Sequence, residues 1–294
     1  MQKIVPSYNG TLRSHQVEVP ACIAECSGIR IFGRRIKSLV FSTDVAIIKN
    51  VNADAIIAVY PFTPQPIIAQ AIINVSDVPV FVGVGGGVTN GPRSVRLAAY
   101  AEHQGAFGVV VNAPLADQTI SQIKNVVDIP VIATIVSAKM DVARRIASGA
   151  DILNVSGAAE TPAIVRHIRE QFPDVPIIAT GGPTEESILE TIRAGANAIT
   201  YTPPTNGSLF AESMRRYRST YAPDQGEPRQ TRRRGGTPPR RPPVRRRASR
   251  FHDNQSGDKL QEECPAAVAI AGEVWYDVCN TGRKRGRADH DRRI

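Results

Sequence analysis

Four polar side chains stand at or near the ends of apolar runs. They are Asp44 after SLVFST, Tyr60 after AIIAV, Asn112 after GVVV and Asn154 within ILNVSG. A carboxylate can act as a general acid or base, and a phenol or an amide can orient a substrate or stabilise an oxyanion. We therefore predict Asp44 as the acid or base, with the other three as orienting donors.

Each of these residues also has a structural alternative. An Asp between a strand and a helix commonly caps the helix, here VAIIKN. Tyr60 and Asn112 lie close to prolines, so both could shape loops. An amide inside an apolar run must be hydrogen-bonded, so Asn154 faces either a partner inside the fold or the ligand.

Two glycine clusters follow apolar runs. VPVFVGVGGGVTNGP contains Gly85, Gly86 and Gly87, and PIIATGG ends in Gly181 and Gly182. Glycine permits positive φ and close backbone approach, so the bare amides could hold a phosphate or another oxyanion. Neither cluster matches the dinucleotide or Walker pattern. The alternative is a tight loop that only lets its neighbours pack.

Other chemistries lack the residues they need. A Schiff-base aldolase requires a lysine on a strand, and Lys139, the nearest, is flanked by SAKMD, which is typical of a helix start. A catalytic metal would need a His, Asp and Glu cluster at strand ends, where only Asp44 qualifies because His103 and His167 fall on expected helices. We predict metal-free chemistry and no metal ligands.

The elements that position these residues follow from eight apolar runs that alternate with amphipathic segments. The runs are continuously apolar, as in strands covered on both faces. Eight units of even length favour an α/β fold, a compact (β/α)8 TIM barrel, over an open doubly wound sheet, and place the site where the strands end. The runs are 38–44, 55–61, 79–85, 108–114, 130–136, 152–157, 176–182 and 198–204.

Composition divides the chain into a barrel cap (1–37), the barrel (38–222) and a tail (223–294). Of the 294 residues, 42% are hydrophobic, which is ample for a core. The net charge is +9, but the tail alone holds 17 Lys and Arg against 10 Asp and Glu. Its Arg- and Pro-rich composition predicts disorder, and we expect nucleic-acid binding, if any, through the tail only.

The compartment is predicted from what the sequence lacks. The four cysteines show no zinc or redox spacing, which indicates reduced thiols. Neither a signal peptide nor a run of about 18 apolar residues occurs, so no membrane contact is expected. We predict a soluble cytoplasmic protein and leave its oligomeric state open.

The segment PIIATGGPTEESILETIRAGANAITYTP resembles the phosphate-binding half of the ribulose-phosphate-binding barrels, such as thiamine phosphate synthase and 2-keto-3-deoxy-6-phosphogluconate aldolase. The resemblance implies phosphate binding by Gly181, Gly182 and the loop at Thr202. There Pro203 and Pro204 replace the family's Gly-Ser, and proline has no amide to donate. Over 7–221, GIRIFGRRIKSLVFSTDVAIIKN and VFVGVGGGVTNG are similar to a bacterial TIM-barrel family with a generic hydrolase label.

Together these features predict an aldolase-type barrel enzyme for a small phosphorylated or otherwise anionic metabolite. It would work by metal-free general acid/base chemistry, as a hydrolase, lyase or isomerase, without a cofactor. One alternative is a flavin-binding oxidoreductase, because nitronate monooxygenases use a similar late Gly-Gly for the flavin phosphate; FMN would then be the cofactor. The other is a non-catalytic ligand sensor with a nucleic-acid-binding tail.

Overall fold

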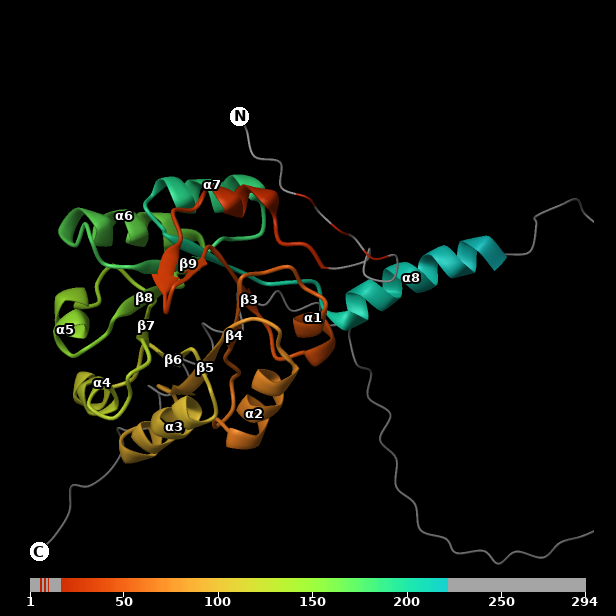
Figure 1. Cartoon of the computed structure of the whole chain (residues 1–294). Coiled ribbons are helices and arrows are strands. Elements are labelled where there is room, and N and C mark those ends of the chain that lie inside the picture. Colours follow the sequence, from red (N-terminus) through yellow and green to blue (C-terminus); the bar gives the residue numbers. More distant parts are fainter. Residues whose placement is uncertain (1–5, 7, 9, 11–16, 222–294) are drawn as a thin grey trace, which may run out of the picture.

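The computed structural model describes residues 6, 8, 10 and 17–221 (Figure 1). The predicted tail, 223–294, and the nucleic-acid binding considered for it lie outside the described residues. So does most of the segment before residue 17, and the bounds of the three predicted domains stay predictions.

Eight parallel strands close into a barrel, which confirms the predicted fold. Every strand is shorter than the apolar run that predicted it. The end of the run lies beyond the strand in every case but β5 (Val80–Gly85), which lacks only the first residue of its run. In the order in which neighbours pair, the strands are β10 (Ala198–Tyr201), β3 (Ser38–Phe41), β4 (Ala55–Ala58), β5 (Val80–Gly85), β6 (Gly108–Val111), β7 (Val131–Ile135), β8 (Ile152–Val155) and β9 (Ile177–Thr180).

Helices α1 to α7 follow the first seven barrel strands and surround the barrel (Figure 1). Their starts carry the expected signals: Asp44 and Thr184 cap α1 and α7, and proline opens α2 and α3. The helices are α1 (Val45–Lys49), α2 (Pro66–Val75), α3 (Pro92–His103), α4 (Asp117–Lys124), α5 (Val142–Ala147), α6 (Thr161–Gln171) and α7 (Glu185–Arg193).

The apolar side chains form two clusters, one on each side of the barrel wall. The larger cluster fills the space between the strands and the helices. The smaller one fills the barrel interior and includes Leu39, Phe81 and Ile132, each fully buried. Burying one such side chain stabilises the fold by roughly 1.5–3 kcal/mol. The interior is therefore a packed core, open to ligands only at an end.

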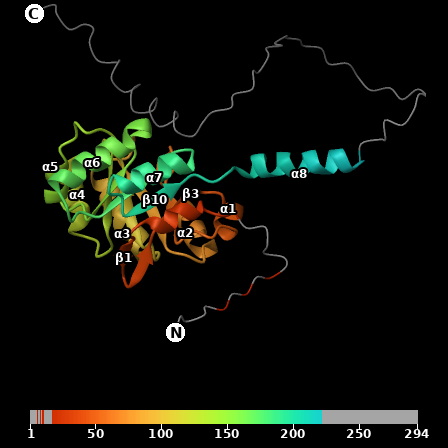
Figure 2. The ribbon, with the colours of Figure 1, turned by 90° about the horizontal axis from the view of Figure 1, so that it is seen from above.

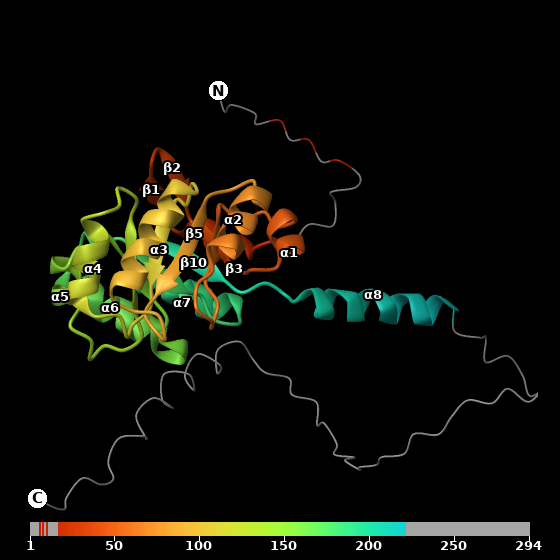
Figure 3. The ribbon, with the colours of Figure 1, turned by 90° about the horizontal axis from the view of Figure 1, so that it is seen from below.

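A short hairpin closes the amino end of the barrel. It consists of β1 (Ile29–Ile31) and β2 (Arg34–Ile36), which pair antiparallel, and its isoleucines join the interior cluster. Phe32 at its tip packs edge-on against Phe107, with ring centroids 5.2 Å apart. Figure 3 shows the hairpin at one end of the barrel, which leaves the opposite end, where the strands finish, for a site.

The 3-10 helix η2 (Ala21–Glu25) packs against α7 and lies beside it in Figure 1. Its Ile23 and the following Cys26 are buried in the same cluster as Val40 and Ile199, the fully buried outward side chains of β3 and β10. Burial raises the pKa of the Cys26 thiol to about 11, so this thiol is neutral at physiological pH. The segment before the hairpin thus helps to cover the barrel wall next to α7.

The last described helix, α8 (Asn206–Tyr221), does not cover the barrel. It extends away from it in all three views (Figures 1, 2 and 3). Its first turn is attached, because Leu209 packs on the core and Asn206 bonds to Asp44. None of the described helices, α8 included, is both long and apolar enough to span a bilayer.

Candidate functional site

The carboxyl end of the barrel has two chemically different halves. Side chains alternate across a strand, so residues two positions beyond an interior residue also face inward. Within β3 to β6 the inward positions near the strand ends are apolar or glycine, and we call them the apolar arc: Phe41, Ile57, Gly83 and Val110. The predicted Asn112 follows β6 directly, two positions beyond Val110; it is half-buried, and its role stays a prediction. Near the ends of β7 to β10 they are polar, and we call them the polar arc: Thr134, Asn154, Thr180 and Thr200.

The polar arc consists of two cross-strand pairs. Thr134 lies opposite Asn154, and the Asn154 amide donates a hydrogen bond to the Thr134 hydroxyl at 3.3 Å. Both residues are buried. The Asn154 side-chain amide therefore has a partner inside the barrel, one of the two alternatives considered for it. Its role toward a ligand stays a prediction.

The second pair is Thr180 and Thr200, which lie opposite each other on β9 and β10. Thr200 is 7% exposed, and its hydroxyl has no hydrogen-bond partner among the described residues. A buried hydroxyl without a partner is destabilising by about 1–3 kcal/mol relative to a bonded one. An unpartnered hydroxyl at the mouth of a barrel is a group that a ligand oxygen can satisfy.

Asp44 holds two helices at the rim. Its Oδ1 accepts hydrogen bonds from the amides of Ala46 and Ile47 at 2.9 and 3.3 Å. Its Oδ2 accepts one from the Asn206 side chain at 2.8 Å. The capping alternative is therefore what the geometry shows. Its role as acid or base is untested and stays a prediction.

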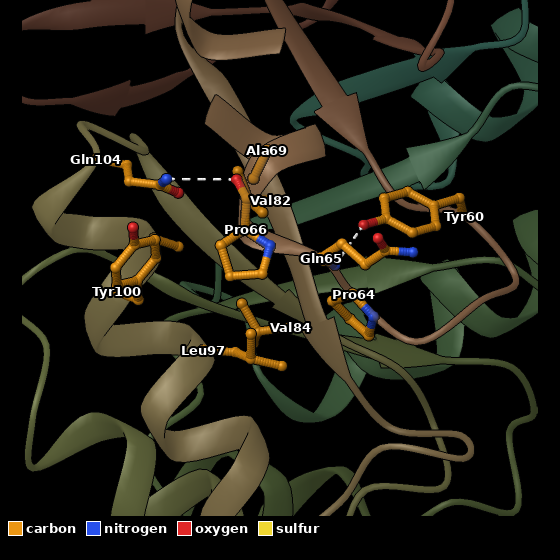
Figure 4. A pocket seen from close by; sticks show the side chains of 12 residues that line it. Tyr60, Pro64, Gln65, Pro66, Ala69, Val82, Val84, Leu97, Tyr100 and Gln104 are labelled. Carbon is orange, nitrogen blue, oxygen red and sulfur yellow. Dashed lines mark hydrogen bonds between the residues drawn. The ribbon is translucent and has the colours of Figure 1, made fainter. Parts of the chain in front are cut away.

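Tyr60 does not line the barrel interior with the polar arc. Its hydroxyl accepts a hydrogen bond from the Gln65 amide at 2.7 Å, which fixes the loop that leads into α2 (Figure 4). Tyr60 borders a small cleft between α2 and α3, outside the barrel wall, together with Leu97 and Tyr100. Its observed contact is the loop-shaping one.

The first glycine cluster packs tightly against the next strand end. Gly86 has φ +106°, and a Cβ there would stand 2.6 Å from the backbone nitrogen of Asn112. The backbone N–H of Asn112 in turn donates to the Gly85 carbonyl at 2.9 Å. Gly87 differs, because nothing lies within 4 Å of its Cβ position. Two of the three glycines thus have a packing reason, and Gly87 borders open space.

The second cluster lies across the mouth from the first, since β5 and β9 are four places apart in the eight-stranded barrel. A Cβ on Gly181 would stand 2.8 Å from side-chain atoms of Ile188 and Ile199, so this glycine permits strand-to-helix packing. Its amide already donates to the Thr200 carbonyl at 3.2 Å. Thr202 is exposed at the rim.

Side chains of the chain itself already cap the start of α7. Thr184 and Ser187 form a reciprocal capping box, and the first turn contains Glu185 and Glu186. Hydrogen bonds from its own amide and from the Thr184 hydroxyl lower the pKa of the Glu186 carboxyl. Two negative charges at this helix start repel a phosphate. Phosphate binding at Gly182, and with it the FMN alternative, remains a prediction.

The described residues do not offer a metal centre of the usual kind. No three His, Cys, Asp or Glu side chains among residues 6, 8, 10 and 17–221 are grouped so that they could hold an ion. Mg2+ is held in proteins by one or two carboxylates together with waters and substrate oxygens, and both oxygens of Asp44 here accept N–H donors. Lys139 is exposed in the β7–α5 loop.

Sequence reasoning missed Thr200. The expected strand ran from 198 to 204, so its polar residues were sought further along, at Thr202. The alternation of inward positions, 198, 200 and 202, is the signal that would have found it.

No protein-family model and no curated protein matches the chain. Solved structures do match in fold. A 2,3-dimethylmalate lyase of the PEP mutase/isocitrate lyase superfamily has a TM-score of 0.50 at 16% identity, over 66% of this chain and 85% of that one. A 4-hydroxy-tetrahydrodipicolinate synthase from Methylacidiphilum fumariolicum SolV has a TM-score of 0.46 at 14% identity, over 56% of this chain and 67% of that one.

A third structure, phosphonopyruvate hydrolase in complex with oxalate and Mg++, has a TM-score of 0.47 at 15% identity, covering 63% of this chain and 81% of that one. At such an identity, the likeness to the 2,3-dimethylmalate lyase shows a (β/α)8 barrel fold and nothing finer. It does not support the predicted metal-free chemistry, which stays a prediction, as do the bacterial family and the ribulose-phosphate group.

Proposed function

We propose that this barrel is an enzyme for a small anionic metabolite, whose oxygen atoms bind the polar arc at the carboxyl end of the strands. The observation that carries the proposal is the buried, unpartnered Thr200 hydroxyl beside Thr180. An unsatisfied polar group is destabilising in the free protein and gains a hydrogen bond when a ligand oxygen arrives.

The neighbouring pair supports the same assignment. Thr134 and Asn154 provide a hydroxyl and an amide that can orient a carbonyl or a hydroxyl group of the substrate. The apolar arc opposite gives the ligand a dry wall, and hydrogen bonds in such surroundings are stronger than in water. Gly87 borders open space at the rim, where its amide can meet the ligand's negative charge.

Within this proposal Asp44 is the acid or base, because it is the carboxylate that directly follows a barrel strand. Asp44→Asn keeps an oxygen for the helix cap and removes the titrating group. If the assignment is right, this variant unfolds at nearly the wild-type temperature and loses turnover. Unchanged turnover would remove Asp44 from the mechanism.

The binding site itself is tested by a thermal-shift screen of small carboxylates, keto acids and phosphorylated metabolites. A true ligand raises the melting temperature of the wild-type protein. We expect Thr200→Val to lose that rise and Thr191→Val to keep it, because the Thr191 hydroxyl is buried on α7 and bonds to the Ser187 carbonyl. A rise that persists unchanged in Thr200→Val would overturn the proposed site.

A further inference from the structure

Helix α8 carries an unpartnered apolar stripe. Phe210, Met214, Tyr217 and Tyr221 recur at spacings of four, three and four, which places them on one face of a helix. They are 69%, 39%, 59% and 84% exposed. These four large side chains form one apolar strip on a helix that leaves the barrel. Exposing such a strip to water is unfavourable, and such patches mark interaction sites.

The helix needs a partner for its own stability. With 16 residues it is about 24 Å long, and isolated helices of this length are marginal in water. Among the described residues, its contacts with the barrel lie in its first turn, at Asn206 and Leu209. In that part of the chain, no surface packs against the rest of α8, so the helix needs a second surface to hold it.

The part of the barrel wall next to which α8 begins, over β3 and β10, offers no vacant place for this stripe. The outward residues Val40 and Ile199 of β3 and β10 are fully buried, and they share a cluster with Ile23 of η2. The same holds for every copy of the chain. We therefore look for the partner of α8 away from this part of the wall.

We propose that α8 pairs antiparallel with α8 of a second copy, so that the protein is a homodimer joined by this helix pair. The 4-3-4 spacing is the seam pattern of a coiled coil. In the antiparallel register Phe210 faces Tyr221 of the other copy and Met214 faces Tyr217, so all four apolar residues of each helix are covered. The two barrels then lie at opposite ends of the pair, where they do not collide.

The charges of α8 agree with this pairing. Arg215 and Arg216 lie away from the seam, and Arg218 flanks it next to Ala211 of the other copy. No arginine faces an arginine across the seam. Glu212 lies within reach of Arg215 and Arg216 on its own helix at spacings of three and four. This inference does not rest on the proposed function.

The oligomeric state of the full chain tests the proposal, by light scattering after gel filtration over a wide concentration range. We expect a wild-type dimer, and a monomer for Met214→Glu combined with Tyr217→Glu. Ser219→Glu, which adds a charge on the opposite face, should stay dimeric. The melting temperature of the barrel shows that each variant is folded. A monomeric wild type, or a dimer that survives the double change, overturns the proposal.

The orientation is tested with a short bismaleimide cross-linker. In the antiparallel pair, Phe210→Cys of one copy lies beside Tyr221→Cys of the other, whereas two copies of Phe210→Cys lie about 16 Å apart along the axis. We expect a 210–221 cross-link only when the two variants are mixed, identified by peptide mapping against the wild-type chain and its native cysteines. A cross-link between two copies of Phe210→Cys would show a parallel pair and overturn the antiparallel arrangement.

Discussion

The two halves of the barrel's carboxyl end bury side chains of different chemistry. In the apolar arc, Phe41, Ile57 and Val110 pack among themselves and need no partner. In the polar arc, the Asn154 amide donates to the Thr134 hydroxyl, and the Thr200 hydroxyl has no partner in the described part of the chain. A fold gains nothing from a buried hydroxyl that bonds to nothing, so the polar half is where we look for a ligand.

The glycine run differs from the polar arc in the same way. The conspicuous run at Gly85 to Gly87 lies in the apolar half, where Gly86 is pressed against the backbone of Asn112. Its conformational freedom is used for packing. The less conspicuous signals, one Asn and three Thr in strands, lie in the half that can bind something.

The largest effect is expected when the apolar arc is made polar. Val110 is 2% exposed, so Val110→Asn loses apolar burial and adds an amide without a partner. We expect unfolding to become easier by about 3–5 kcal/mol, measured by urea denaturation. The reciprocal change, Asn154→Val, should lose only about 1–2 kcal/mol, the value of the bond to Thr134. Equal losses would show that the two arcs are not different environments.

A second comparison lies within the glycine run. Gly86→Ala places a Cβ against backbone atoms at a φ that alanine avoids, so we expect a loss of about 2–3 kcal/mol. Gly87→Ala enters open space, and its loss should stay within about 0.5 kcal/mol. Calorimetric melting of both variants checks this. If Gly87→Ala were as damaging as Gly86→Ala, the loop would be packed along its whole length.

Asp44 offers a smaller effect. Asp44→Ala removes the cap of α1 and the acceptor of Asn206, so we expect a loss of about 1–2 kcal/mol. Asp44→Asn, which can still accept at the cap, should lose only a few tenths of a kcal/mol. Denaturation midpoints separate the two variants. A large loss in Asp44→Asn would mean that the negative charge itself, beyond its hydrogen bonds, stabilises the rim.

The fold was predictable because the sequence of each β/α unit alone indicates its strand and its helix. Continuous apolar runs marked all eight strands, and residues such as Asp44 and Thr184 marked helix starts. The departure of α8 was not predictable. Its stripe of Phe210, Met214 and Tyr217 reads like that of a helix that packs on its own barrel, and only the burial of Ile199 beside η2 shows that no place is left there.

The candidate site was predictable only in part, because residue type does not fix the direction of a side chain. Asn154 was found, since an amide in an apolar run demands a partner. Tyr60 was expected at the mouth, but its hydroxyl bonds to Gln65 at the cleft between α2 and α3. Thr200 was missed because the expected strand ran on to residue 204, whereas β10 ends at Tyr201, so polar residues were sought beyond the true strand end.

The smallest expected change in stability differs in sign between two threonine variants. Thr200 and Thr191 are both buried threonines. The Thr191 hydroxyl donates to the Ser187 carbonyl at 2.8 Å, whereas the Thr200 hydroxyl has no partner within the described residues. Valine has nearly the shape of threonine without the hydroxyl. We therefore expect Thr191→Val to lose about 1 kcal/mol and Thr200→Val to gain about 0.5–1 kcal/mol in the ligand-free protein, measured by urea denaturation of both. A gain in stability joined to a loss of ligand response is typical of a residue retained for binding. If Thr200→Val were instead destabilised like Thr191→Val, its hydroxyl would have a partner within the fold, and the polar arc would be part of the core.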